Sequence, residues 1–251
     1  MPSKRKGALG FFQPLRICRA VEMRKEKVIR GKKVNKDSRE MLLASATHLF
    51  GRRGYHGTTI EDITRASGVS RGALYWHFSS KSELLGAVVD RLRGEFLDRM
   101  KSEIEVKETK ASSKLFSIFK FCARFAVEKT DLIHCLRNLS LELSPSEDVH
   151  VQAFFKILDE QRNFILRIIE EAQKEGYVRR DLDANILAGL ILAIHDGILL
   201  QWTAFRRIFD GRDLAKAARE VMLLGMSSVP DRVSGILGSS VVGKVESDKN
   251  S

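Results

Sequence analysis

The sequence has little proline, cysteine and tryptophan, and it has no long apolar run. Its 251 residues include 4 prolines, 3 cysteines and 2 tryptophans. The cysteines, Cys18, Cys122 and Cys135, are odd in number and form no Cys-x-x-Cys pair. The sequence therefore predicts neither a disulfide framework nor a zinc site, and it favours the reducing cytoplasm. The longest apolar run, residues 186–194, is well short of the ~18 residues that a membrane-spanning helix needs, so no membrane partner is expected.

Motifs of the common enzyme classes are also missing. The chain has no Gly-x-Ser-x-Gly, no P-loop, no dinucleotide-binding fingerprint and no metal-ligand spacing. The neighbours His195 and Asp196 are an acid/base candidate, but adjacent residues on a helix point about 100° apart and cannot form a proton relay. We therefore expect no catalytic residue, no metal, no cofactor and no enzymatic activity.

Positive charge is concentrated at the N-terminus. Residues 1–36 hold twelve Lys and Arg against two Glu, so they carry +10 of the net charge of +11. This excess indicates a polyanionic partner, most simply nucleic acid, although an anionic membrane surface fits the charge alone. The segment lacks periodicity and is expected to be disordered. It is either a solvated extension without function or an arm that enters the minor groove; Met23 leaves open whether residues 1–22 are translated.

Capping signals and helical periodicity predict an all-α fold. Residues 37–40 read as a capping box that opens a helix closed by Gly51 and Gly54. A short helix then starts at residues 58–61, turns Ile60, Ile63 and Ala66 inward, and stops at Gly68. Ser70 caps another short helix, and residues 80–83 cap a longer one. We expect a polar break over residues 101–113.

The remaining sequence predicts a second helical domain. Helices are expected over residues 115–127, which are apolar nearly all round, and over residues 132–143. Ser144 and Pro145 are read as the start of a long helix that ends near residue 175. Two further helices are predicted over residues 183–209 and 214–226. No strand pattern and no internal repeat is present.

Two short helices that meet at a tight turn suggest a helix-turn-helix. Gly68 can adopt the positive φ that the turn needs, and Val69 and Leu74 suit a small core between the helices. The second helix would then present large side chains outward: Arg71, Tyr75, Trp76 and His77. Exposed aromatic and cationic groups do little for solubility, but they suit a major groove, where they meet phosphates and base edges.

These residues resemble the TetR family of repressors. The resemblance rests on Gly68-Val-Ser-Arg-Gly-Ala-Leu-Tyr-Trp-His-Phe78 followed by Lys81-Ser-Glu-Leu-Leu85, and it covers about residues 38–90. The C-terminal region is similar to the family through the number and order of its helices. Its Asp196-Gly197-x4-Trp202 stretch looks most like the AcrR-type branch, whose members often control multidrug efflux pumps.

The resemblance implies a DNA-binding surface on the N-terminal domain. Thr59, Tyr75, His77 and Lys81 would bind phosphates, whereas the remaining candidates would face bases or the adjoining backbone: Ser70, Arg71, Gly72 and Trp76. The alternatives are that Tyr75 and Trp76 pack on the domain core and that His77 is an exposed capping residue.

The resemblance also implies a ligand pocket and a homodimer in the C-terminal domain. The pocket candidates are mostly apolar, which suits a largely hydrophobic effector: Phe119, Cys122, Phe125, Leu139, Phe155, Leu158, His195, Asp196 and Leu199. Phe119 and Phe125 are alternatively core residues, and Asp196 alternatively makes a hydrogen bond within the helix or an interface. The dimerisation candidates lie on the last two helices: Ile198, Gln201, Trp202, Phe205 and Met222. Trp202 could instead fill the core of its own subunit.

We therefore expect four segments: a basic extension (1–36), a helix-turn-helix domain (37–82), a ligand-binding and dimerisation domain (83–227) and a flexible tail (228–251). The predicted function is a cytoplasmic repressor that binds a palindromic double-stranded operator and is released by a hydrophobic small molecule. An activator or a ligand-independent regulator is the alternative, and a nonspecific basic DNA-binding protein is a further one.

Overall fold

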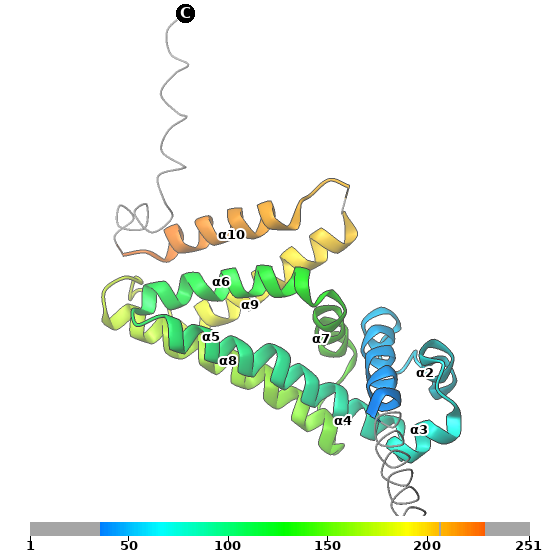
Figure 1. The fold of residues 1–251 in the computed structure, drawn as a ribbon. Helices are drawn as coiled ribbons and strands as arrows, with labels where there is room; N and C mark the ends of the chain where they lie inside the picture. Colours follow the sequence, from blue (N-terminus) through cyan, green and yellow to red (C-terminus); the bar gives the residue numbers. More distant parts are fainter. Residues whose placement is uncertain (1–35, 206, 229–251) are drawn as a thin grey trace, which may run out of the picture.

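The computed structural model describes residues 36–205 and 207–228, which form two groups of helices (Figure 1). No strand occurs within these residues; the single β-bridge joins Val178 to Ser227. The all-α prediction is therefore confirmed. Residues 1–35 of the predicted basic extension and all but the first residue of the predicted C-terminal tail lie outside the described residues.

The N-terminal group consists of a helix over residues 36–53, α2 (Ile60–Ser67) and α3 (Arg71–His77). Its centre contains fully or nearly fully buried side chains from each helix and the turn after α3: Leu42, Ala46, Phe50, Ile63, Leu74 and Phe78. The prediction of an N-cap at Asp37 is wrong, because residue 36 is already helical. Ala66 is exposed rather than inward, since Ser67 occupies the buried position at the end of α2.

Local chemistry explains the sharp turn between α2 and α3. The α2 N-cap is Thr59, one residue later than the predicted box, and Thr59 and Asp62 cap each other reciprocally. Gly68 ends α2 with φ +69°, the left-handed conformation that glycine adopts without strain. Ser70 then caps α3 by accepting a 3.2 Å hydrogen bond from the Ala73 N–H. The predicted helix-turn-helix is present.

One long helical rod leads out of the N-terminal group. It comprises α4 (Lys81–Leu92), the π-helical segment η1 (Arg93–Asp98) and α5 (Arg99–Lys107). The expected break over residues 101–113 is therefore wrong for its first part. Met100 and Ile104 are buried, and the Lys101 ammonium lies 3.0 Å from the Glu160 carboxylate, so tertiary packing extends the helix through a polar stretch.

Five further helices complete the C-terminal group: α6 (Ala111–Glu128), α7 (Thr130–Glu142), α8 (Val149–Lys174), α9 (Ala184–Ala204) and α10 (Gly211–Met226). Helix α8 begins four residues after Pro145, because the Asp148 carboxylate caps the His150 and Val151 N–H groups. Helix α9 ends at Ala204, five residues before the predicted end. Helix α10 starts three residues early because Asp210 caps it.

Much of the apolar surface of helix α9 is left exposed by the rest of the described chain. Within the described ranges it is long and apolar enough to cross a membrane, yet only 22% of its most apolar window is buried. Several apolar side chains of α9 and α10 are exposed: Ile186, Leu190, Leu200, Val221 and Leu224. Exposed apolar side chains in this number on two helices are typical of an association surface.

Candidate nucleic-acid interface and internal cavity

Helix α3 presents an aromatic and cationic outer surface. Trp76 is 69% exposed and Tyr75 is 45% exposed, values unusual for large aromatic residues. The Arg71 guanidinium lies 5.6 Å from the Tyr75 ring centroid and pairs with Glu61 on α2 at 2.6 Å. A Cβ added to Gly72 would meet nothing within 4 Å, so this part of the helix is open to close approach. Neither aromatic residue packs on the domain core.

The other DNA-binding candidates are engaged within the protein. The Thr59 and Ser70 hydroxyls accept capping hydrogen bonds from backbone N–H groups. His77 Nε2 shares a 2.8 Å hydrogen bond with the Ser38 hydroxyl, and burial followed by the neighbouring Arg39 lowers the pKa of His77. Lys81 Nζ lies 4.3 Å from the Tyr55 ring centroid, and desolvation lowers its pKa. Thr59, Ser70 and His77 lie at the ends of α2 and α3, and Lys81 begins α4, so all four border the exposed surface of α3.

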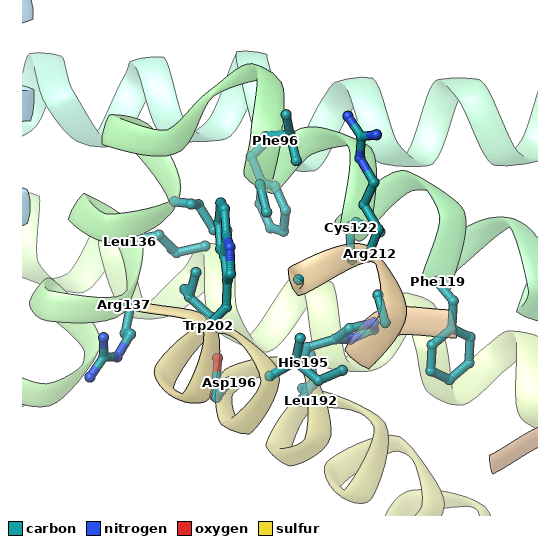
Figure 2. Close-up of a pocket in the computed structure, with 18 of the residues that line it drawn as sticks. Phe96, Phe119, Cys122, Leu136, Arg137, Leu192, His195, Asp196, Trp202 and Arg212 are labelled. Carbon is teal, nitrogen blue, oxygen red and sulfur yellow. The ribbon is translucent and has the colours of Figure 1, made fainter. Parts of the chain in front are cut away.

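A cavity of about 630 Å³ lies inside the C-terminal group (Figure 2). Its lining comes from η1, from α6 to α10 and from the connection before α10. Among the lining residues are the following: Phe96, Phe119, Cys122, Leu136, Arg137, Leu158, Leu192, His195, Asp196, Ile198, Leu199, Trp202, Phe209 and Arg212. The volume is in the range of pockets that hold drug-sized ligands.

Several polar side chains line the cavity beside the apolar ones: Cys122, Arg137, Ser140, Gln161, His195, Asp196, Trp202, Asp210 and Arg212. Burial raises the pKa of the Cys122 thiol to about 12, so it stays protonated at neutral pH. Asp196 lines the cavity, and desolvation raises the pKa of its carboxyl while the nearby Arg137 opposes the shift. Burial lowers the pKa of His195 to about 4, so its imidazole is neutral at pH 7.

Six of the nine predicted pocket residues line this cavity: Phe119, Cys122, Leu158, His195, Asp196 and Leu199. Phe125, Leu139 and Phe155 do not. Phe125 is 1% exposed, stacks on Phe121 and lies tilted against Phe96 in the core, and Leu139 is fully buried. Phe155 packs edge-on against Phe154, away from the lining. Helical periodicity shows that a residue faces inward, but not whether another side chain meets it there.

The dimerisation candidates separate into two groups. Ile198 and Trp202 line the cavity, which agrees with the alternative that Trp202 belongs to its own subunit. Met222 is 7% exposed and forms part of the core, so it does not lie on the outer face of α10. Gln201 and Phe205 are exposed. Helices α9 and α10 both line the cavity, so several of their larger side chains face the cavity and not the outer surface.

Phe96 and Arg212 line the cavity although sequence reasoning did not place them there. Phe96 lies in η1, and π-helical turns are frequently found at functional sites. A π-helical turn holds one more residue than an α-helical turn. No sequence signal marks it, because tertiary packing decides where that residue is accommodated. Arg212 is the second residue of α10, whose N-cap is Asp210. The Asp210-Gly211 pair is a helix-start signal in the sequence, and it could have placed Arg212 in the first turn of α10.

Helix α7 connects the cavity to the helix-turn-helix. One face lines the cavity, while polar side chains on another face contact the N-terminal group. Asn138 Nδ2 donates a 2.7 Å hydrogen bond to the Gly51 carbonyl, and Asp131 lies 3.1 Å from His48 Nδ1. At the C-terminal end of α7, the Glu142 carboxylate accepts hydrogen bonds of 2.5 and 2.6 Å from the N–H groups of residues 55 and 56.

The Glu142 contact requires glycine in the turn. A Cβ on Gly54 would lie 2.2 Å from a Glu142 carboxylate oxygen, and Gly54 has φ +75°. Similarly, a Cβ on Gly51 would lie 3.0 Å from the Cys135 backbone nitrogen. The N-terminal helix and α7 therefore approach each other with almost no intervening side chain.

Helix α4 makes a second connection. Arg91 forms an ion pair with Glu40 on the N-terminal helix, and Ser82 donates a 2.6 Å hydrogen bond to Asp148 at the start of α8. The His150 ring packs so closely on Gly86 that an added Cβ would lie 2.3 Å from its Nδ1. The two groups of helices are thus joined through both α4 and α7.

Comparison with known proteins gives a consistent assignment. The family model for "Bacterial regulatory proteins, tetR family" matches residues 42–88, and the model for "YsiA-like protein, C-terminal region" matches residues 89–225. The HTH-type transcriptional repressor DhaR of Mycobacterium sp. (strain GP1) is 31% identical, covering 65% of this chain and 81% of that protein.

Solved structures share the fold. The MbdR regulator from Azoarcus sp. CIB superposes with a TM-score of 0.68 and 28% identity, covering 75% of this chain and 98% of that chain. FadR from Bacillus subtilis in complex with stearoyl-CoA superposes with a TM-score of 0.62 at 22% identity, covering 74% and 98%. The second likeness shows the fold alone.

Proposed function

Because the chain belongs to the tetR family of bacterial regulatory proteins, which are transcriptional regulators and not enzymes, we propose that it is a cytoplasmic, ligand-responsive repressor. It binds a palindromic operator as a homodimer, and a largely hydrophobic molecule in the cavity releases it. The observation that carries this proposal is the pairing of an exposed aromatic and cationic α3 with an internal cavity, joined through α7.

The exposed residues of α3 support DNA binding. Tyr75 and Trp76 are exposed, so packing in the core does not account for large aromatic residues at these positions. Arg71 lies beside Tyr75, where its guanidinium can donate hydrogen bonds to phosphates or base edges. A recognition helix of this kind reads the major groove through its outward side chains, while groups near the helix ends contact phosphates. Lys81 and the hydroxyls of Thr59 and Ser70 lie in the second kind of position.

The exposed apolar face of α9 and α10 supports a homodimer. A single helix-turn-helix covers few base pairs, whereas two copies about one helical turn apart (~34–36 Å) read a palindrome. Ile186 and Val221 are 69% and 71% exposed, and a second copy of the same face would cover them. The dimer interface thus uses the outer side of these helices rather than the cavity side.

The cavity supports release by a ligand. A ligand that fills it presses on α7, and α7 holds the N-terminal group through Asn138 and Glu142. Release follows if the occupied form places the two recognition helices too far apart for neighbouring grooves. Because the coupling is reciprocal, operator DNA weakens ligand binding by the same factor.

The alternatives predict different behaviour. A ligand-independent regulator does not require a cavity beside the contacts between the two groups of helices. A nonspecific DNA-binding protein would depend on the basic N-terminal segment for most of its affinity. An activator shares the same DNA surface. Control of an efflux pump is a further proposal, which rests on the likeness to the AcrR-type branch.

Selection of bound sequences from random DNA tests the proposal directly. We expect a palindrome from the full chain and the same palindrome after deletion of residues 1–36. Tyr75→Ala should weaken operator binding at unchanged dimerisation, and Tyr75→Phe separates the hydroxyl from the ring. A monomer without sequence preference, or a preference that disappears with residues 1–36, would refute the proposed function.

A further inference from the structure

His195 stands out among the polar groups of the cavity. Neither of its ring nitrogens has a hydrogen-bond partner within the described residues, and both are closed off from solvent. Its ring lies on α9 beside Phe119 of α6, with centroids 5.1 Å apart and planes inclined by 49° (Figure 2). Buried polar atoms without partners are rare in folded proteins and often have a functional reason.

The neutral state of the ring restricts what it can bind. With its pKa lowered to about 4 by burial, the imidazole offers one N–H donor and one lone-pair acceptor at neutral pH. Such a group pairs well with a hydroxyl or a carbonyl. It provides no positive charge for a carboxylate and no negative charge for an ammonium group.

The formal charges of the lining residues sum to zero. Arg137 and Arg212 are matched by Asp196 and Asp210. Asp210 is already used as the α10 cap, where it accepts a 2.7 Å hydrogen bond from the Arg212 N–H. In Figure 2 the guanidinium groups of Arg137 and Arg212 extend away from His195. The labelled side chains beside the His195 ring are those of Phe119 and Leu192, both apolar.

We propose that His195 is the hydrogen-bonding anchor of the cavity and that the effector is an uncharged, mainly apolar molecule with one hydroxyl or carbonyl group. This inference rests on the proposed function and specifies the ligand class of the same cavity. The imidazole lines the cavity, and rotation about its Cβ–Cγ bond, a broad and soft torsion, turns a ring nitrogen toward the ligand. A site built to hydrogen-bond such a group discriminates strongly against ligands that lack it.

Three probes with one ten-carbon body and different head groups test the inference: decan-1-ol, decanoate and decylammonium. The chain has two tryptophans, of which Trp202 lines the cavity and Trp76 lies on α3. In a full-length Trp76→Phe background, Trp202 fluorescence reports binding to the cavity alone. We expect decan-1-ol to bind more tightly than either charged probe.

Substitutions at His195 separate the anchor from the shape of the cavity. His195→Leu should weaken decan-1-ol about tenfold, the usual effect of one lost hydrogen bond, and leave the charged probes unchanged. His195→Gln should retain part of the preference, because its amide also donates and accepts. Leu192→Ala is the matched control and should weaken all three probes alike. His195→Leu should also melt at a temperature no lower than the parent, since it removes two buried polar atoms that have no partner in the described part of the chain.

Each outcome decides the question. Tighter binding of decanoate or decylammonium, or equal binding of decan-1-ol by the parent and His195→Leu, overturns the inference while leaving the ligand cavity intact. Binding of none of the three probes overturns the cavity as an apolar ligand site and with it the proposed ligand response. The operator selection described above is independent of both results.

Discussion

The contact between Glu142 and the turn after the N-terminal helix gives a quantitative prediction. Glu142→Gln keeps the size of the side chain but replaces one carboxylate oxygen by an NH₂ group that faces a backbone N–H donor. One of the two hydrogen bonds to residues 55 and 56 is therefore lost. Hydrogen bonds to charged groups contribute about 1.5–3 kcal/mol, and partial exposure of this contact favours the low end, about 1.5 kcal/mol or roughly tenfold.

Amide hydrogen exchange measures this loss at the affected atoms. In Glu142→Gln we expect the amides of Tyr55 and His56 to exchange roughly tenfold faster, because their protection depends on the carboxylate. The free energy of unfolding from urea titration should fall by about 1.5 kcal/mol. Any ligand that dissociates the parent from its operator should bind the variant equally well but release DNA less completely, because α7 no longer holds the turn firmly.

Glu147 supplies the control. It lies exposed in the connection between α7 and α8, and Glu147→Gln removes the same charge from the same region. It should change neither exchange nor stability. Unchanged exchange at both amides in Glu142→Gln, or an equal effect in the control, would show that the carboxylate does not hold the turn and that coupling through α7 is wrong.

Three further predictions follow from burial and packing. Gly86→Ala should lower the free energy of unfolding by about 1–3 kcal/mol in urea titration, because the added methyl overlaps the His150 ring; unchanged stability would show that the ring moves aside at no cost. The folded pKa of His195, about 4, lies below its unfolded value near 6.5, so its contribution is complete above pH 6.5 and is lost as the pH falls toward 4. Acidification should therefore destabilise the parent by about 3 kcal/mol more than His195→Leu in parallel urea titrations, and parallel pH profiles would contradict this. Val221→Glu places a charge on a side chain that is 71% exposed in one subunit, and sedimentation should show weaker dimers without loss of helicity, whereas an unchanged dimer would place the interface elsewhere.

Much of the helix-turn-helix could be predicted because its signals are local. Ser70 and Gly68 act through hydrogen bonds and backbone conformation within a few residues, so the sequence indicates the two short helices and their turn. The exact N-cap residue of α2 was harder to predict from the sequence. Thr58 and Thr59 are both suitable N-caps, and burial of Thr58 in the core makes Thr59 the cap.

The cavity could be predicted only in part. Periodicity indicated inward faces for Phe119, Cys122 and Phe125, but it could not show that Phe125 packs against Phe96 and Phe121 while Phe119 and Cys122 line the cavity. Whether an inward residue is core or lining depends on which side chains of other helices reach it. That information is absent from the spacing along one helix.

By itself, the sequence determined the all-α class, the capped helix-turn-helix and the aromatic, cationic character of α3, because caps, turns and periodicity depend on neighbours along the chain. Only the tertiary structure decided that α5 continues α4 through a polar stretch and that α7 connects the cavity to the turn at residues 54–57. It also decided that the two ring nitrogens of His195 find no hydrogen-bond partner among the residues that the structure describes. These features arise where segments far apart in the sequence pack together, and the free energy of such contacts depends on geometry that no local pattern records.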